Sequence, residues 1–351
     1  MKKQIIYVFL LFILYNYSFS QNIKDTAKTE QVTKLFSSQK ILPIKLSYSI
    51  KEIKKETNDS TYIKTNISYQ IEDGSWEILE VELRRRGNFR LDNCYFPPIK
   101  VKIKKSAGKG TLFEGNKKLK LVLPCSSKKG VNDYIVKEYM AYKLYEIISL
   151  YHFKTRIVDI SFTEIKDKKT KSFNLKGILV EDDKNVAKRH GGKVLKKRIH
   201  PMAHDPVTSV QNSFFQYLIG NTDYSTYAQH NEKLLFVNKL FVPLPYDFDM
   251  SGLVDTQYSV VSVINDEQLP ISSVTDRLYR GFKRDPKVIQ QVRKEFIDNE
   301  IELLEIADSL EPFFENPKEF FVTKKFISDF FVVMKIDAKF KKEITSKLRT
   351  K

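Results

Sequence analysis

The apolar residues of this chain change their spacing along the sequence, and that change limits the folds open to it. From about residue 41 to residue 123 they alternate with polar residues in short segments, as in Ile99, Val101 and Ile103, which lysines separate. This period of two predicts half-buried strands of an antiparallel sheet. Over residues 133–151 apolar residues recur three and four positions apart, which predicts one amphipathic helix within the β-rich half.

The second half of the sequence has a mainly helical pattern. Strand patterns cover 157–162 and 173–180, a hairpin pattern covers 234–244, and helical spacing covers 206–220, 287–310, 317–334 and 338–348. The 351 residues, 42% of them hydrophobic, supply enough apolar side chains for one large core or two coupled cores. We therefore expect a two-lobed α+β protein, with a β-rich N-terminal lobe over residues 41–183 and a mainly helical C-terminal lobe over residues 184–351.

Residues 1–20 have the pattern of a secretory signal peptide. Lys2 and Lys3 precede an apolar run, and a Ser-Phe-Ser sequence ends at Ser20. The run is shorter than the roughly 20 apolar residues that a membrane-spanning helix needs. Residues 21–40 are polar and typical of a linker. We expect export to the periplasm or the extracellular space without a stable membrane span after cleavage; an uncleaved N-terminal anchor is the alternative.

The sequence contains two cysteines, Cys94 and Cys125. Because the chain is expected to enter an oxidising compartment, we expect them to form one disulfide that closes a loop of about 30 residues. Two buried free thiols are the alternative. The spacing matches neither a CxxC redox motif nor a zinc cluster.

Lysine and arginine number 60 against 43 acidic residues, which gives a formal charge of +17. Most of the excess is lysine scattered through amphipathic segments, and no arginine-rich arm or zinc-finger spacing occurs. This pattern favours a solvated basic surface, and we expect no nucleic-acid partner. A basic, glycine-containing loop over residues 188–198 could bind an acidic substrate, but a solvated loop is the favoured interpretation.

Polar residues are densest in two segments that flank the predicted hairpin. The first contains Asp223 and Asn231, and the second contains Asp247 and Asp249, separated by one phenylalanine. Carboxylate and amide oxygens suit Mg²⁺ or Mn²⁺. Asx turns that cap neighbouring elements explain the same residue types equally well.

Phosphoryl transfer needs a similar inventory of side chains. One carboxylate orients the acceptor hydroxyl, while an amide and a second carboxylate hold metal against the nucleotide phosphates. The chain order assigns the first role to Asp223, the amide role to Asn231, and the metal role to Asp247 or Asp249. The first two are eight positions apart, whereas about five separate them in the protein-kinase loop, so the segment between them must bulge.

Several motifs over residues 83–252 resemble the CotH family of spore-coat-type atypical kinases, particularly an exported Bacteroidetes-type branch. They are RGNFR at 86–90, CYFPPI at 94–99, LKLVLPC at 119–125, VKEYMAYKL at 136–144 and GILVE at 177–181, together with the two acidic segments. The resemblance implies an atypical protein-kinase-like fold, with ATP and Mg²⁺ (or Mn²⁺) as cofactors. The chain departs from the family pattern in having Tyr246 where many members have tryptophan before the acidic pair.

The resemblance also implies roles for individual residues. Asp223 takes the catalytic position, and Asp247 or Asp249 takes the metal position; together with Asn231 from the chain order, these two aspartates are the candidate metal ligands. The nucleotide-binding candidates are Arg86, Glu181, Tyr246 and one of three lysines, Lys100, Lys102 or Lys120. Each of these lysines could equally be an exposed strand residue. Glu138 is either the partner of such a lysine or a solvated helix residue.

The sequence thus suggests an exported, CotH-like phosphotransferase that depends on ATP and a metal and acts on an envelope protein or glycan. ATP is scarce outside the cytoplasm, so a catalytically silent binding or structural module of the envelope is the alternative. The presence of Asp223, Asp247 and Asp249 together favours activity, because a binding module has no need of all three.

Overall fold

The computed structural model describes residues 32–87, 89–264 and 267–350. The expected signal peptide over residues 1–20 and the first part of the expected linker, residues 21–31, lie outside the described residues. Helix α1 (Lys34–Ser37) falls within the last part of that linker. It buries Leu35 and Phe36 against the strands that follow.

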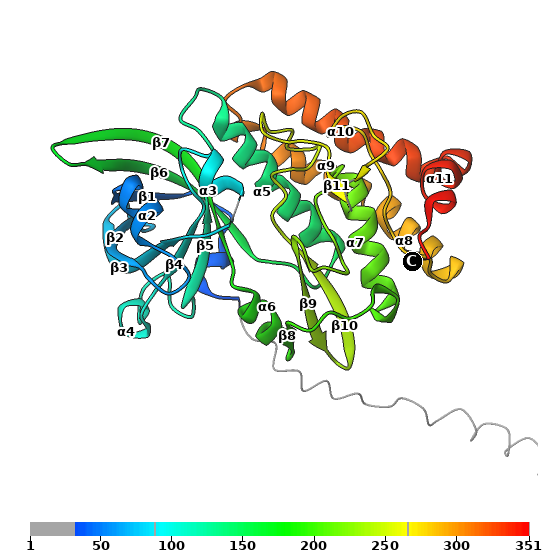
Figure 1. Ribbon diagram of the computed structural model, residues 1–351, viewed down its shortest axis with the longest axis horizontal. Helices are drawn as coiled ribbons and strands as arrows, with labels where there is room; N and C mark the ends of the chain where they lie inside the picture. Colours follow the sequence, from blue (N-terminus) through cyan, green and yellow to red (C-terminus); the bar gives the residue numbers. More distant parts are fainter. Residues whose placement is uncertain (1–31, 88, 265–266, 351) are drawn as a thin grey trace, which may run out of the picture.

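Seven strands close into a barrel in the order β1-β2-β3-β4-β5-β7-β6 (Figure 1). They are β1 (Leu42–Tyr48), β2 (Ile63–Gln70), β3 (Trp76–Arg85), β4 (Ile99–Lys102), β5 (Lys118–Val122), β6 (Thr155–Lys166) and β7 (Lys169–Val180). Neighbouring strands are antiparallel except β1 and β6, which pair in parallel from Leu42 opposite Val158 to Tyr48 opposite Glu164. The β6–β7 hairpin extends well beyond the rest of the barrel.

The expected two-lobed kinase-like fold, with a β-rich N-terminal lobe and a mainly helical C-terminal lobe, is wrong, because the N-terminal strands form a closed mixed barrel. Alternating hydrophobicity shows which face of a strand is buried, but it does not show which strand is the neighbour. The parallel pairing of β1 with β6 joins segments more than 100 residues apart and closes the sheet. In the closed barrel each of the seven strands has a paired neighbour on both sides, which protects strand edges that would otherwise be exposed.

The barrel has its own apolar core. Side chains at alternate positions of each strand point inward, as the period of two predicts. The largest fully buried ones are aromatic and include Tyr69, Phe96, Phe113 and Phe162. Phe96 packs edge-on against Phe162 and Phe173, so the loop before β4 is fixed to the β6–β7 hairpin.

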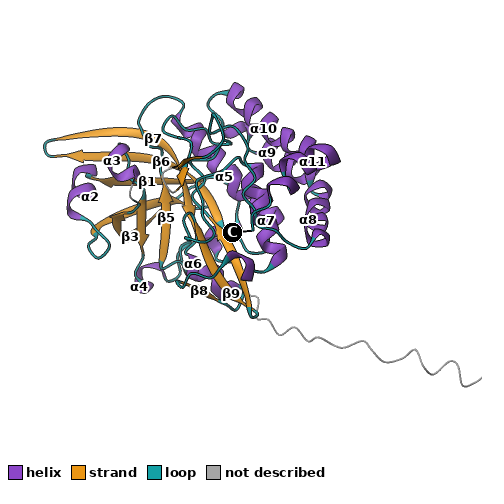
Figure 2. Cartoon of the chain, turned by 45° about the vertical axis from the view of Figure 1, so that its right-hand side comes forward, coloured by secondary structure: helices purple, strands orange, loops and turns teal. Residues whose placement is uncertain are grey.

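A second core forms around helix α5 (Val131–Ile148), which lies between the barrel and the helices of the C-terminal part, α7 to α11 (Figure 2). The other helices are α2 (Ile50–Glu56), α3 (Phe89–Asn93), α4 (Lys105–Gly108), α6 (Asp183–Arg189), α7 (Pro206–Leu218), α8 (Pro286–Asp298), α9 (Glu300–Ser309), α10 (Pro317–Lys335) and α11 (Asp337–Glu343). Strands β8 (Lys193–Leu195), β9 (Glu232–Val237) and β10 (Leu240–Pro245) form a small antiparallel sheet, and β11 (Val263–Ile264) pairs with β12 (Glu267–Gln268).

Helix α5 is buried on nearly all sides because it contacts β6 and β7 on one side and α7 and α9 on the other. It therefore buries charged residues, including Asp133, Lys137 and Glu138. Asp133 accepts hydrogen bonds from the backbone N–H groups of Glu315 and Asn316. This contact fixes the segment before α10 to the start of α5.

The disulfide between Cys94 and Cys125 is confirmed. It joins the segment after α3 to the segment after β5, and the Tyr95 N–H donates a hydrogen bond to the Cys125 carbonyl at 2.7 Å. Arg90, four residues before Cys94, donates to the carbonyl of Leu123. One disulfide and two hydrogen bonds thus hold the residues from Arg90 to Tyr95 against the end of β5.

Within the described residues, no helix combines the length and the apolar character needed to cross a bilayer.

Removal of the disulfide should destabilise the protein by about 3 to 4 kcal/mol, because the unfolded chain regains the entropy of an open loop of about 30 residues. We expect the double variant Cys94→Ala/Cys125→Ala to show this loss in urea unfolding. Reducing agent should lower the stability of the parent protein and leave that of the double variant unchanged. Equal stability of the oxidised parent and the double variant would contradict the assignment.

Candidate functional site

Six charged side chains meet where the end of the barrel, helix α5 and the segment after β10 come together. We call this group the charged cluster. Its members are Arg86, Arg90, Lys120, Glu138, Asp247 and Asp249. Three are basic and three are acidic, so the cluster holds equal numbers of each charge in a buried place.

The buried residue between the two aspartates of the acidic pair holds them in position. Phe248 is fully buried, with its ring centroid 4.7 Å from that of Tyr142 on α5. Asp247 adopts a left-handed backbone conformation, φ 66°, and its N–H donates a hydrogen bond to the Tyr142 hydroxyl at 3.0 Å. Because Phe248 anchors the turn in the core, the carboxylates of Asp247 and Asp249 on either side point away from it, toward the basic residues.

Two arginines contact the acidic pair. Arg86 Nη1 lies 3.7 Å from Asp247 Oδ2, and Arg90 Nη1 lies 3.6 Å from Asp249 Oδ2. The Tyr258 hydroxyl donates a hydrogen bond of 2.8 Å to the same oxygen of Asp249. These are ion pairs longer than close hydrogen-bonded pairs, which usually measure about 2.7–2.9 Å between nitrogen and oxygen.

The pKa values of the acidic residues move in opposite directions. Burial favours a raised pKa for Asp247, but the charges of Arg86 and Lys120 outweigh burial and hold its pKa below the ordinary value. Burial, together with the neighbouring charge of Asp247, raises the pKa of Asp249. Burial and the charges of both aspartates raise the pKa of Glu138 well above its ordinary value. The three carboxyl groups therefore lie close together, and the charges of the aspartates disfavour ionisation of Glu138.

Lys120 and Glu138 have buried charged atoms that lack hydrogen-bond partners within the described chain. These atoms are the Lys120 Nζ and the Glu138 Oε1. The Lys120 ammonium lies 3.6 Å from the ring centroid of Tyr246. Burial, followed by the repulsion of Arg86, lowers the pKa of Lys120 to about 7. An unpaired buried charge is costly, and groups perturbed in this way concentrate at functional sites.

Asp223 lies on the segment before β9 and is held by side chains on both oxygens. His230 Nε2 lies 3.1 Å from Oδ1, and Asn231 Nδ2 donates to Oδ2 at 2.9 Å. Asn231 has a left-handed backbone, φ 50°, which closes the bulge between the two residues. The hydrogen bond to His230 is the main reason that the pKa of this histidine is raised.

The structure brings this segment beside the acidic pair. The Tyr246 N–H donates a hydrogen bond to the Asn231 carbonyl at 3.0 Å. The charge of Asp223 contributes to the raised pKa of Asp249, and the charge of His230 contributes to the lowered pKa of Asp247. Asp223, Asn231, Asp247 and Asp249 therefore occupy one neighbourhood.

Three of the expected nucleotide-binding residues have other partners. Lys100 pairs with Asp182 at 2.8 Å, and Lys102, which is 41% exposed, pairs with Glu82 at 2.6 Å. Glu181 accepts two hydrogen bonds from Arg189, at 2.6 and 2.7 Å. Of the three candidate lysines, Lys120 is the one that joins the charged cluster.

Sequence reasoning did not select Arg90, His230 or the burial of Glu138. Residues 84–90 contain four of the chain's twelve arginines, including Arg90. This local enrichment in arginine is the sequence pattern that could have identified Arg90. Glu138 lies four residues before Tyr142, one helical turn away on the same face. No local pattern marks His230.

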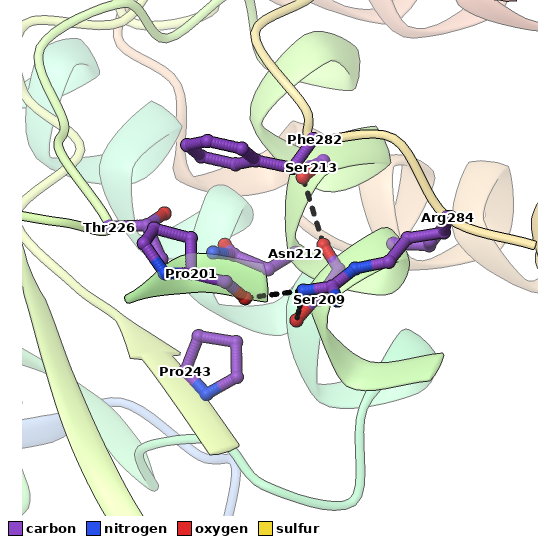
Figure 3. Close-up of a pocket in the computed structure, with 9 residues that line it drawn as sticks. Pro201, Ser209, Asn212, Ser213, Thr226, Pro243, Phe282 and Arg284 are labelled. Carbon is purple, nitrogen blue, oxygen red and sulfur yellow. Dashed lines mark hydrogen bonds between the residues drawn. The ribbon is translucent and has the colours of Figure 1, made fainter. Parts of the chain in front are cut away.

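The small cavity in Figure 3 is separate from the charged cluster. It lies beside α7 and β10 and is lined by residues such as Ser209, Pro243 and Arg284. Arg284 donates hydrogen bonds to the Pro201 carbonyl and to the Ser209 hydroxyl. The cavity has a volume of about 10 Å³, which is room for about one water molecule, so it is too small to bind a nucleotide.

A divalent cation fits the charged cluster if it arrives with phosphates. Within residues 32–87, 89–264 and 267–350, no three His, Cys, Asp or Glu side chains are arranged as a metal site. Mg²⁺ commonly takes only one or two carboxylates from the protein and completes its shell with water and substrate phosphates. The crowded negative charge of Asp247, Asp249 and Glu138 is chemically suited to such a cation.

The sequence matches no protein-family model, and no curated protein is significantly similar to it. The resemblance to the CotH family therefore depends on the short motifs alone.

Replacement of Lys120 by methionine should raise the free energy of unfolding by roughly 2–4 kcal/mol at pH 6, because one pKa unit corresponds to about 1.4 kcal/mol. The loss of the contact with Tyr246 offsets part of this gain. The pKa of Lys120 is about 7 in the folded protein against an ordinary 10.5. Its cost is therefore full below pH 7 and fades as the pH rises toward 10.5.

Urea unfolding of the parent and of Lys120→Met between pH 6 and pH 10 measures this difference. A variant that is less stable than the parent at pH 6, or a difference that does not change with pH, would contradict the description of Lys120 as a buried, unpaired cation.

Proposed function

We propose that the charged cluster binds a nucleoside triphosphate with Mg²⁺ or Mn²⁺ and that the protein transfers a phosphoryl group to a hydroxyl acceptor. The observation that supports this most strongly is that the acidic pair lies beside Lys120, which interacts with Asp247 and whose buried ammonium has no hydrogen-bond partner among the described residues. Phosphoryl transfer depends mainly on positioning and on electrostatic stabilisation, and it needs both charge types in one place.

The basic residues of the cluster are suited to nucleotide phosphates. Lys120 offers three donors on a buried nitrogen, and Arg86 and Arg90 offer planar guanidinium groups. Asp247 and Asp249 would hold the cation, which when bound neutralises the phosphate charge and stabilises the charge that develops during transfer. The Tyr246 ring, over which the Lys120 ammonium lies, forms the aromatic border of the proposed phosphate site.

Asp223 is suited to contact the acceptor. Its carboxylate is about 29% exposed, and His230 and Asn231 fix its orientation. A carboxylate positioned in this way accepts the hydroxyl proton as the acceptor oxygen attacks the phosphorus atom. The hydrogen bonds from the imidazole and the amide hold it in one rotamer and reduce the cost of positioning it.

The acceptor that we propose is an envelope protein or glycan, because the N-terminal pattern predicts export. The Cys94–Cys125 disulfide supports this, since disulfides persist in oxidising compartments. The same location supports a second candidate function, a silent binding module, because ATP is scarce outside the cytoplasm. The contacts of Arg86 with Asp247 and of Arg90 with Asp249 favour that second function, since they occupy the carboxylates that would hold the cation.

Substitutions at the three aspartates should separate nucleotide binding from transfer. Asp247→Asn and Asp249→Asn should weaken metal-dependent ATP binding by about tenfold or more, because each removes a charge that holds the cation. Asp223→Asn should change ATP affinity by less than about twofold and slow transfer about 100-fold or more, because it acts on the acceptor in the transition state. Isothermal titration with ATP and Mg²⁺ and a phosphate-incorporation assay measure the two quantities.

Asp308→Asn is the matched control, because Asp308 forms a surface pair with Lys324 far along the chain from the cluster. It should leave both quantities unchanged. Normal metal-dependent affinity in both acidic-pair variants would refute the assigned roles. If the parent protein does not bind ATP, the silent binding module becomes the better description.

A further inference from the structure

An open groove of about 700 Å³ lies on the outside of the barrel next to the charged cluster. It runs between the segment after α2 and the end of β3. Its polar lining comes from Asn58, Asp59, Ser60, Arg84, Arg85 and Arg86. Arg86 also contacts Asp247, so the groove leads directly to the cluster.

The concentration of arginine here is unusual for this chain. Of its 60 basic residues only 12 are arginines, and four of these fall within residues 84–90. Elsewhere the chain uses arginine where several directed donors are needed. Arg277 and Arg280, for example, donate to interior backbone carbonyls. Lysine supplies most of the remaining basic charge, so arginine in an open groove indicates a ligand that uses the planar guanidinium group.

The charges of the three groove arginines are weakly satisfied. Arg84 also donates hydrogen bonds to the Tyr62 hydroxyl and the Arg85 carbonyl, but its carboxylate partner, Asp59, has a side chain that is 97% exposed, and a surface pair of this kind contributes little stability. Arg85 donates from Nε to the Thr57 carbonyl at 2.7 Å, and it pairs with no carboxylate in the described part of the chain. Arg86 is 3.7 Å from Asp247. A row of guanidinium groups therefore extends from solvent to the cluster.

We propose that this groove binds an acidic polypeptide segment and so selects an acidic protein as the acceptor. A carboxylate of the segment pairs with the fork of Arg85, and a second displaces Asp59 from Arg84. Asn58 and Ser60 on the facing segment suit the amide groups of a peptide backbone. The described lining contains no aromatic ring on which a sugar could stack, and this favours a polypeptide over an acidic glycan.

The proposal rests on the proposed function only in naming the bound segment as the acceptor. A fluorescein-labelled peptide of alternating glutamate and serine is the probe, and fluorescence anisotropy at low salt measures its affinity. The parent protein should bind it, and Arg85→Gln should weaken binding about tenfold, as the loss of one charge-assisted pair predicts. Arg85→Lys keeps the charge but loses the fork, so its loss should be intermediate.

Lys339→Gln is the matched control, because Lys339 is exposed on helix α11, outside the groove, and its loss changes the net charge equally. It should change peptide affinity by less than about twofold. Thermal unfolding of each variant shows whether a loss of binding reflects a loss of folding. A glutamine–serine peptide of the same length should not bind.

The proposal is overturned if Arg85→Gln binds the acidic peptide as the parent does, or if Lys339→Gln weakens binding equally. It is also overturned if polygalacturonate binds more tightly than the peptide and loses affinity in Arg85→Gln, which would identify an acidic glycan instead. ATP and Mg²⁺ titrated into the same samples test the proposed function separately. If the parent protein binds the peptide through Arg85 but does not bind ATP, the peptide-binding groove is supported and the proposed phosphotransferase activity is refuted.

Discussion

The burial of helix α5 is the constraint on which the rest of the structure depends. The helix packs against β6 and β7 of the barrel on one side and against α7 and α9 on the other, so it lies at the centre of the second core, to which Ile157 of β6 and Ile178 of β7 also contribute. Because little of its surface reaches solvent, its polar residues must find partners inside the protein. Asp133 does so with two backbone N–H groups, and Tyr142 accepts the N–H of Asp247. Glu138, one turn before Tyr142, is buried, and one of its oxygens has no hydrogen-bond partner in the described part of the chain.

The charged cluster follows from this burial and carries a cost in stability. Three carboxyl groups and three basic side chains are removed from water, yet in both arginine–aspartate pairs, Arg86 with Asp247 and Arg90 with Asp249, the nitrogen and oxygen are more than 3.5 Å apart. Buried ion pairs recover their desolvation cost only when their geometry is close and fully hydrogen-bonded. A barrel stabilised by its own core and by a disulfide can tolerate such a region. The arrangement is therefore better explained by a ligand-binding role than by stability, since hydrophobic side chains of similar size would serve stability better.

The sequence predicted where most strands lie, but it did not predict the topology that joins them. The alternation around Val101 identified β4, and the Asp-Phe-Asp pattern placed two carboxylates on either side of a buried ring, because both features are local. The parallel partner of β1 lies beyond α5, and no local period encodes such a pairing. Lys100 and Lys120 are direct neighbours across β4 and β5, so their sequence contexts are equivalent. Only their tertiary surroundings differ: Lys100 meets Asp182, and Lys120 meets an aromatic ring.

The position of the disulfide connects the barrel to the chemistry of the cluster. Cys94 ends the segment that carries Arg86 and Arg90, and Cys125 follows the strand that carries Lys120. One covalent bond therefore restrains two basic elements relative to each other, while Phe248 anchors the acidic pair against α5. Electrostatic catalysis and phosphate binding both lose strength when charged groups must reorganise around the ligand. Cations fixed to the barrel and carboxylates fixed to the helix meet that requirement, and the groove arginines extend the same fixed row of charge toward solvent.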